Sequence, residues 1–223
     1  MKNLQKTVMI TMALTVAMVV GAESVSATEN AKKPAVSKKV TKPLTPWAQS
    51  YKYEEEKKYE KAINVIKPYL KKREDVELAN MRVAWLEYLQ GNYNAAIKGY
   101  EKALNINPDS IEAKLGLSLP LMAQKRYREV RRHLNKIIKK SPWNYTAHQR
   151  LLAIDEIQGK WKHLTKHAKA VSKRFPSDTA TLVYVARGYA RQKNKTMAKN
   201  VYSRVLLRVP RHNEATNYIK NNK

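Results

Sequence analysis

The chain has no cysteine among its 223 residues. Disulfides, cysteine-ligated zinc, thiol catalysis and a lipid-modified N-terminal cysteine are therefore excluded. Glycine is also scarce, with six residues, and they form neither a phosphate-binding loop nor a Gly-x-Ser-x-Gly nucleophile turn. We therefore expect a protein that is not an enzyme and that needs no cofactor.

Candidate metal ligands are few. His163 and His167 stand four residues apart, a spacing that can bring two imidazoles to one metal ion. No glutamate lies between them as in a metalloprotease helix, no third ligand is evident, and Lys162 and Lys166 would repel a cation. We expect a pair of surface histidines and no metal site.

Acidic residues are outnumbered, with 18 Asp and Glu against 44 Lys and Arg, and the formal net charge is +26. The excess of basic residues is unevenly distributed along the chain. From Ile111 onward there are 26 basic and 6 acidic residues, a net charge of +20. The second half of the chain therefore predicts a strongly basic surface.

No apolar run is long enough to span a membrane. The longest, Val8–Gly21, has 14 residues where a spanning helix needs about 20. It follows Lys2 and Lys6 and precedes small residues, which predicts a secretory signal peptide over residues 1–27 with cleavage after Ala27. Cleavage after Ala22 and an uncleaved membrane anchor are the alternatives. We expect an exported protein, periplasmic or secreted.

Two further segments flank the body of the chain. Residues 28–42 are rich in lysine, lack a helical apolar stripe and predict a flexible linker. Residues 211–223 begin a helix too short to be stable alone, so we expect them to cap the preceding structure through Ala215, Tyr218 and Ile219.

The body of the chain repeats every 34 residues. Between two of the repeated prolines, one apolar-periodic run ends near Gln90 and a second begins at Tyr93, which predicts a helical hairpin. The same pattern recurs without insertion or deletion from about residue 43 to residue 210. The period is marked by Pro108, Pro142, Pro176 and Pro210.

This period, in which small and aromatic residues recur at fixed positions of each repeat, resembles that of the tetratricopeptide repeat family. The matching second-helix residues are Gly91, Tyr93, Ala96, Tyr100, Ala103 and Pro108. First helices depart from the pattern, for example at Leu121 and Asp155, where the family has an aromatic residue. The resemblance implies an all-α, right-handed solenoid of stacked helix-turn-helix hairpins with a short C-terminal capping helix. Five repeats are expected, at residues 43–76, 77–110, 111–144, 145–178 and 179–212.

In the family that the chain resembles, first helices line a concave groove that holds partner segments. Helical phase puts eight aromatic, apolar and methionine residues on that side of the first three repeats. The phase does not decide between an exposed groove and packing on the next repeat. These residues are Trp47, Tyr51, Met81, Trp85, Tyr88, Leu115, Leu119 and Met122.

The second helices of such a solenoid form its convex wall, and here that wall is basic. It could be a solvated face, or it could bind an anionic partner. Export disfavours nucleic acid as that partner, and no stacking aromatic platform is visible on the wall. The basic residues are Arg132, Lys136, Lys139, Lys140, Lys162, Lys166, Lys169, Lys173 and Arg174.

These patterns favour a non-enzymatic scaffold or adaptor of the cell envelope. A peptide or partner protein would occupy the groove, and the basic face would bind an anionic envelope component. The alternative is a module that binds an acidic glycan, a teichoic-type polymer or lipid head groups, with the basic face as its main site. Exported proteins of the family that the chain resembles commonly serve envelope assembly, secretion or polysaccharide export.

Overall fold

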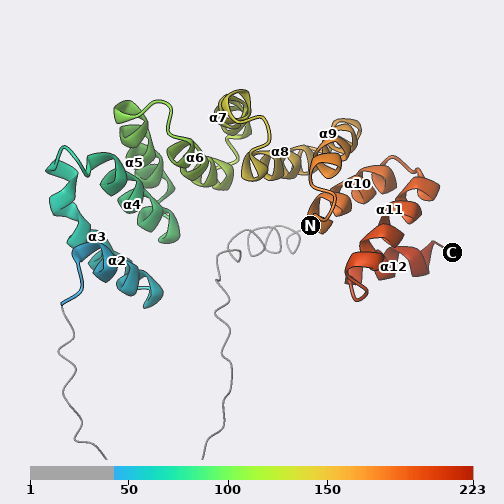
Figure 1. The fold of residues 1–223 in the computed structure, drawn as a ribbon, viewed down its shortest axis with the longest axis horizontal. Coiled ribbons are helices and arrows are strands. Elements are labelled where there is room, and N and C mark those ends of the chain that lie inside the picture. Colours follow the sequence, from blue (N-terminus) through green and yellow to red (C-terminus); the bar gives the residue numbers. More distant parts are fainter. Residues whose placement is uncertain (1–42, 223) are drawn as a thin grey trace, which may run out of the picture. The chain divides into compact units, whose positions relative to one another are not determined.

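The computed structural model describes residues 43–222, which belong to the compact unit Pro43–Lys223. Over this range the chain forms eleven α-helices and one 3₁₀-helix, with no strand (Figure 1). The predicted signal peptide and linker lie outside the described residues. None of the described helices is long and apolar enough to cross a membrane.

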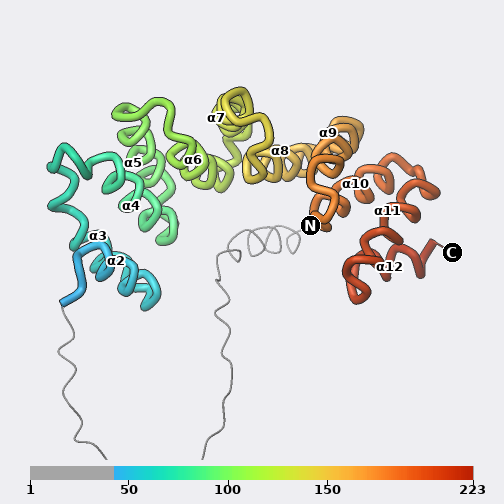
Figure 2. The backbone as a smooth tube through the Cα atoms, in the orientation of Figure 1, coloured from blue at the N-terminus to red at the C-terminus, as the bar shows by residue number. Residues whose placement is uncertain are grey.

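The helices pack in consecutive pairs, and each pair packs on the next (Figures 1 and 2). Turns of three residues join the two helices of a pair. Helices that are far apart in sequence do not pack extensively on each other within the described range. The elements are α2 (Pro46–Glu55), α3 (Tyr59–Ile66), the 3₁₀-helix η1 (Lys67–Lys71), α4 (Val76–Leu89), α5 (Tyr93–Ile106), α6 (Ile111–Ala123), α7 (Tyr127–Lys140), α8 (Tyr145–Ile157), α9 (Trp161–Arg174), α10 (Thr179–Arg191), α11 (Lys195–Arg208) and α12 (Asn213–Asn221).

The turn inside each pair requires one residue in the left-handed region. Gly91 has φ +84° and Gly159 has φ +65°, a conformation that glycine adopts without steric cost. Three other pairs place a lysine there, with φ between 57° and 61°. These residues are Lys57, Lys125 and Lys193. The alternation of Gly and Lys in this column of the sequence thus marks a fixed backbone geometry.

The turns between pairs end one helix and cap the next. Ser110 and Asn144 accept hydrogen bonds from the backbone of Ala113 (3.2 Å) and Ala147 (2.9 Å), which satisfies amides that have no partner inside the helix. The first pair differs, because α3 ends at Ile66 and continues as η1. Pro68 has no amide hydrogen to donate, so the α-helical ladder cannot run through it.

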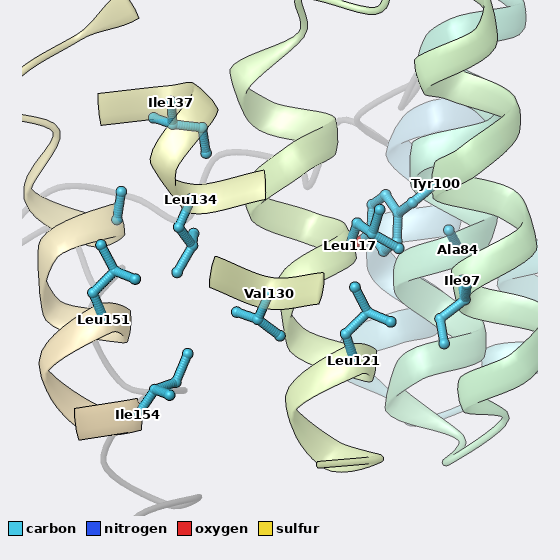
Figure 3. Close-up of a cluster of buried hydrophobic side chains, with 11 residues drawn as sticks. Ala84, Ile97, Tyr100, Leu117, Leu121, Val130, Leu134, Ile137, Leu151 and Ile154 are labelled. Atoms are coloured by element: carbon cyan, nitrogen blue, oxygen red, sulfur yellow. The ribbon is translucent and has the colours of Figure 1, made fainter. Parts of the chain in front are cut away.

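Two apolar clusters form most of the core. The first joins helices α4 to α8. Figure 3 shows this cluster and labels ten of its side chains, among them Tyr100, Leu121 and Leu134. The second joins α8 to α12. Helix α8 serves both, since Leu151 and Ile154 belong to the first cluster and Leu152 to the second.

Helix α12 covers the end of the second cluster. Ala215 is fully buried there, and Tyr218 and Ile219 pack beside it. The Tyr218 ring lies 4.6 Å from that of Tyr202, centroid to centroid. The predicted all-α solenoid of stacked hairpins with a capping helix is confirmed.

Candidate functional site

The eight predicted groove residues lie at three matched places along α2, α4 and α6. We call this surface the first-helix face. Tyr51 is 53% exposed, and the other seven are partly buried. Met81, Leu115 and Met122 pack against the first apolar cluster with one side. The alternatives of groove and core are therefore not exclusive, because each side chain packs inward and keeps an outer surface.

Aromatic contacts fix the orientation of the α4 residues. The indole Nε1 of Trp85 donates to Oε1 of Glu54 at 2.7 Å, across the α2–α4 contact. Its ring centroid lies 5.6 Å from that of Tyr88, which in turn lies 5.9 Å from Tyr93. Such tilted pairs hold aromatic rings in place beyond their burial alone. The first-helix face is thus preorganised around Trp85.

Two arginines 68 residues apart lie beneath the same face, Arg82 buried and Arg150 partly buried. Arg82 donates from Nε to Oγ of Ser50 at 3.0 Å, pairs with Glu54, and stacks 3.9 Å from the ring centroid of Tyr51. Arg150 makes the equivalent bond to Ser118, also 32 residues earlier. The repeated Arg–Ser spacing was a signal in the sequence, and Arg82 was missed.

Arg150 differs from Arg82 because no carboxylate of the described residues pairs with it. It donates to the carbonyl of Leu115 and to Ser118, and it is largely buried. Burial lowers its pKa to about 10, although Tyr100 and Tyr88 partly oppose this. A guanidinium without a counter-charge therefore lies next to the aromatic and apolar residues of the first-helix face.

The corresponding surface of α8 and α10 is polar, and its side chains form hydrogen bonds and ion pairs with neighbouring side chains. Gln149 donates to Thr181 at 2.6 Å and to Asp178 at 3.0 Å. Arg187 bridges Glu156 at 3.2 Å and Glu214 at 2.6 Å, and these hydrogen bonds and charges raise its pKa. The face therefore changes from aromatic and apolar on α2, α4 and α6 to polar and charged on α8 and α10.

A buried carboxylate in α8 is the main feature that sequence reasoning missed. Asp155 is fully buried and is paired with Arg131 of α7. Nδ1 of His163 donates to its Oδ2 at 2.6 Å, and Nδ1 of His167 lies 3.9 Å from the same oxygen. The histidine pair was expected on the surface, but His167 is half-buried and both rings reach Asp155. Arg131 of α7 turns toward the same group.

The network continues to the next turn through His148. Its Nε2 donates to the carbonyl of Pro142 at 2.8 Å, so its Nδ1 accepts from Nε2 of His167 at 2.9 Å. Burial and the neighbouring His167 lower the pKa of His148, against the Pro142 hydrogen bond. Burial alone would raise the pKa of Asp155, but its polar contacts with His167, Arg131 and His163 lower it to about 2. Within the described residues, no cluster of three or more His, Asp or Glu has a geometry that could hold a metal ion.

The predicted basic residues are all exposed or partly exposed, from Arg132 to Arg174. Among these nine, only Lys140 has an ion pair within the described range, with Asp109 at 3.2 Å. Four lysines follow one stripe of α9 and line a hollow of about 420 Å³ beside Tyr189 and Gln192. They are Lys162, Lys166, Lys169 and Lys173.

Comparison with known proteins supports the fold. The family model described as tetratricopeptide repeat matches residues 87–154. No curated protein sequence matches the chain significantly. Similar solved structures include YrrB, described as a TPR protein with an unusual peptide-binding site, with a TM-score of 0.64 and 15% identity over 78% of this chain and 90% of YrrB.

Two further solved structures are similar at the same low identity. MamA from Desulfovibrio magneticus RS-1 gives a TM-score of 0.65 and 13% identity over 74% of this chain and 93% of MamA. TTC0263, a TPR protein of Thermus thermophilus, gives 0.56 and 14% over 79% and 96%. The resemblance stated from the sequence is thereby confirmed: residues 87–154 are tetratricopeptide repeat sequence, and the described part of the chain has the fold of tetratricopeptide repeat proteins.

Proposed function

We propose that the chain is a non-enzymatic scaffold whose first-helix face binds an extended segment of a partner protein. The observation that carries this proposal is the row of half-exposed Trp, Tyr, Met and Leu side chains on α2, α4 and α6, held in place from below. Aromatic and methionine side chains of this kind are typical anchors for a peptide. The similarity to YrrB, whose description names a peptide-binding site, supports the same reading.

Peptides selected from a displayed library against the full chain test this proposal. Trp85→Ala with Tyr88→Ala should weaken binding of the selected peptides by about 10-fold or more, because truncating a central aromatic anchor costs about 2 kcal/mol. Trp143→Ala is the matched control, since Trp143 is 47% exposed and lies outside this face. Peptides that bind the double variant as they bind the parent would place the site elsewhere.

A second candidate function rests on the lysine-lined hollow of α9 and its exposed neighbours. Here the basic face is the main site and takes an anionic polymer of the envelope. Four unpaired cations on one stripe favour a repeating anion. Affinity for polyphosphate should fall linearly with the logarithm of salt concentration, as for other polyanions that release counterions. Peptide binding at an aromatic face should change little.

Export is part of both proposals. A signal peptide over residues 1–27 would place the chain in the periplasm or the medium, which suits an envelope scaffold. Mass spectrometry of the protein recovered from its own cells tests this directly. A chain that begins at Thr28 or Glu23 supports export with cleavage, and a chain that keeps Val8–Gly21 supports an anchor.

A further inference from the structure

One edge of the described repeats collects every turn between helix pairs. Each pair folds back on itself, so the second helix of one pair ends where the first helix of the next pair begins. We call these connections and the adjoining helix ends the inter-repeat edge. Contacts join one turn to the next: Asn107–Glu77 (3.2 Å), Lys140–Asp109 (3.2 Å), the rings of Tyr145 and Phe175 (5.4 Å between centroids) and Arg208 to the Pro176 carbonyl (3.2 Å).

Exposed apolar side chains concentrate on this edge. Ten large hydrophobic side chains are exposed in the described range, and six of them lie there. The most exposed is Leu207, at 82%. The six are Leu78, Ile106, Trp143, Tyr145, Leu207 and Val209. By contrast, the turns inside the pairs, such as 90–92 and 158–160, consist of Gln, Glu, Gly, Asn, Lys and Arg.

Positive charge accompanies the apolar residues at the last three turns of the edge. The cations are Lys139, Lys140, Lys173, Arg174, Arg208 and Arg211. Two carboxylates lie among them, and both are occupied. Asp178 caps α10 and accepts from Gln149, while Glu214 accepts from Arg187 and Tyr202. The first turns of the edge instead carry acids, including Asp109 and Glu77.

A hollow of about 500 Å³ opens beside these turns, between the start of α6 and the end of α7. Lys136, Lys139 and Lys140 line it together with Lys114, whose Nζ donates to the Pro108 carbonyl at 2.5 Å. Burial lowers the pKa of Lys114. Asp109, the ion-pair partner of Lys140, also lines the hollow, which is large enough for a phosphate-bearing head group.

Exposed apolar residues, two beside the turn at 141–144 and two beside the turn at 209–212, with cations between them, suit a flat anionic surface better than a protein groove. Trp and Tyr concentrate where membranes meet water, and Lys and Arg near such a surface are attracted to anionic lipids. A soluble polyanion would draw on the cations but would leave Trp143 and Leu207 without a partner. The combination points to a bilayer.

We propose that the last three turns of the inter-repeat edge dock the protein on an anionic lipid bilayer. Trp143, Tyr145 and Leu207 enter the interfacial layer, and the six cations pair with lipid phosphates. The inference rests on the anionic partner proposed above and assigns it a different surface from the α9 stripe. The first-helix face remains free for a peptide in this arrangement.

Vesicles of phosphatidylcholine with and without phosphatidylglycerol test the proposal with the full chain. Because the protein has no cysteine, Leu207→Cys can carry a single environment-sensitive fluorophore. Its emission should shift to the blue with the anionic vesicles alone. Ile157→Cys is the matched control, since Ile157 is 48% exposed at the far end of α8, away from the edge.

Charge variants separate the edge from the α9 stripe. Lys139→Glu with Arg174→Glu and Arg211→Glu should weaken vesicle binding by roughly 100-fold, because each basic residue near an anionic surface contributes about a factor of five. Lys162→Glu with Lys166→Glu and Lys169→Glu makes the same change of net charge on the stripe and should weaken it far less. An equal loss from both sets, or a larger loss from the stripe, overturns the edge assignment.

The apolar residues separate a bilayer from a soluble polymer. Trp143→Ala with Leu207→Ala should weaken binding to anionic vesicles while binding to polyphosphate stays as in the parent. Vesicle binding that this variant retains in full, or a Leu207 label that does not respond, overturns the proposal. Loss of peptide binding at the first-helix face would not bear on it, so the two proposals fail separately.

Discussion

Leu121 and Asp155 occupy the same place in two consecutive repeats, 34 residues apart, and they solve the same packing problem in opposite ways. Leu121 is buried among Val130, Leu134 and other apolar side chains of the first cluster. Asp155 is equally buried, but Arg131 and two histidines surround it. The fold therefore accepts either an apolar contact or a charged network at this place, and only the second makes stability depend on pH.

The same contrast separates two longer segments of the described chain. From α4 to α7, neighbouring helices meet mainly through apolar side chains. From α7 to α12, carboxylates join helices as well, through the buried Asp155 and through the partly buried Glu156 and Glu214 with Arg187. The difference teaches that the period fixes which residues face inward, whereas their chemistry can change from repeat to repeat.

Asp155→Asn should have the largest effect, about 4 kcal/mol of unfolding free energy at pH 7, because it leaves Arg131 without its buried partner. The pKa of Asp155 falls from its ordinary 3.8 to about 2 on folding. Its stabilisation is therefore present above pH 4 and is lost as the pH falls toward 2. Urea unfolding at several pH values measures this. A loss that stays constant down to pH 2 would contradict the network.

Leu121→Ala should cost about 3 kcal/mol, the usual loss for a fully buried leucine truncated in a packed core. The other members of the first cluster are apolar or tyrosine side chains that do not titrate between pH 4 and pH 7, so this loss should be the same at both pH values. The comparison with Asp155→Asn would fail if both losses changed with pH in parallel.

Tyr202→Phe should cost about 1 kcal/mol, because the Tyr202 hydroxyl donates to Oε1 of Glu214 at 2.6 Å and so attaches α12. Tyr100 stands at the same place in the repeat, three units earlier, and lies in the apolar first cluster. Tyr100→Phe is the matched control and should be nearly neutral. Thermal unfolding of both variants and of the parent measures these changes in stability. Equal losses of stability in the two variants would show that the hydrogen bond to Glu214 contributes nothing.

The smallest expected effect concerns His148. Folding lowers its pKa, so the unfolded chain binds the proton more readily, and stability present above its ordinary pKa of 6.5 is lost as the pH falls below it. A proton on Nδ1 would also face the donor of His167. His148→Gln should flatten the decline in stability between pH 7 and pH 5. An unchanged slope would assign the decline to other groups, such as His133, whose pKa burial also lowers.

The sequence was sufficient for the fold, because a 34-residue period with fixed turn positions leaves few other arrangements. Lys125 and Lys193 stand where Gly91 and Gly159 stand, and their positive φ values explain that column. The buried network could not be predicted in the same way. Helical phase grouped His163 with His167, but it does not tell how far a long side chain such as that of Arg131 reaches across to another helix.

The candidate site shows the same limit. Phase identified the side on which Trp85 and Tyr88 lie, and the structure adds that both are half-buried and oriented by Glu54 and Tyr93. The unpaired Arg150 beneath them depends on which carboxylates come within reach, and spacing alone does not give this. Peptide binding, export and the anionic partner stay predictions.

Helix α8 supplies adjacent side chains to both apolar clusters, with Leu151 and Ile154 on one side and Leu152 on the other. Neither half of the repeat array could unfold without exposing the buried side chains on one side of this helix. Heat or denaturant should therefore release the repeats from α4 to α12 together, and the protein would behave as one cooperative block although its contacts are all between neighbours. The half of the array that carries the first-helix face would then lose stability in acid together with the half that holds Asp155.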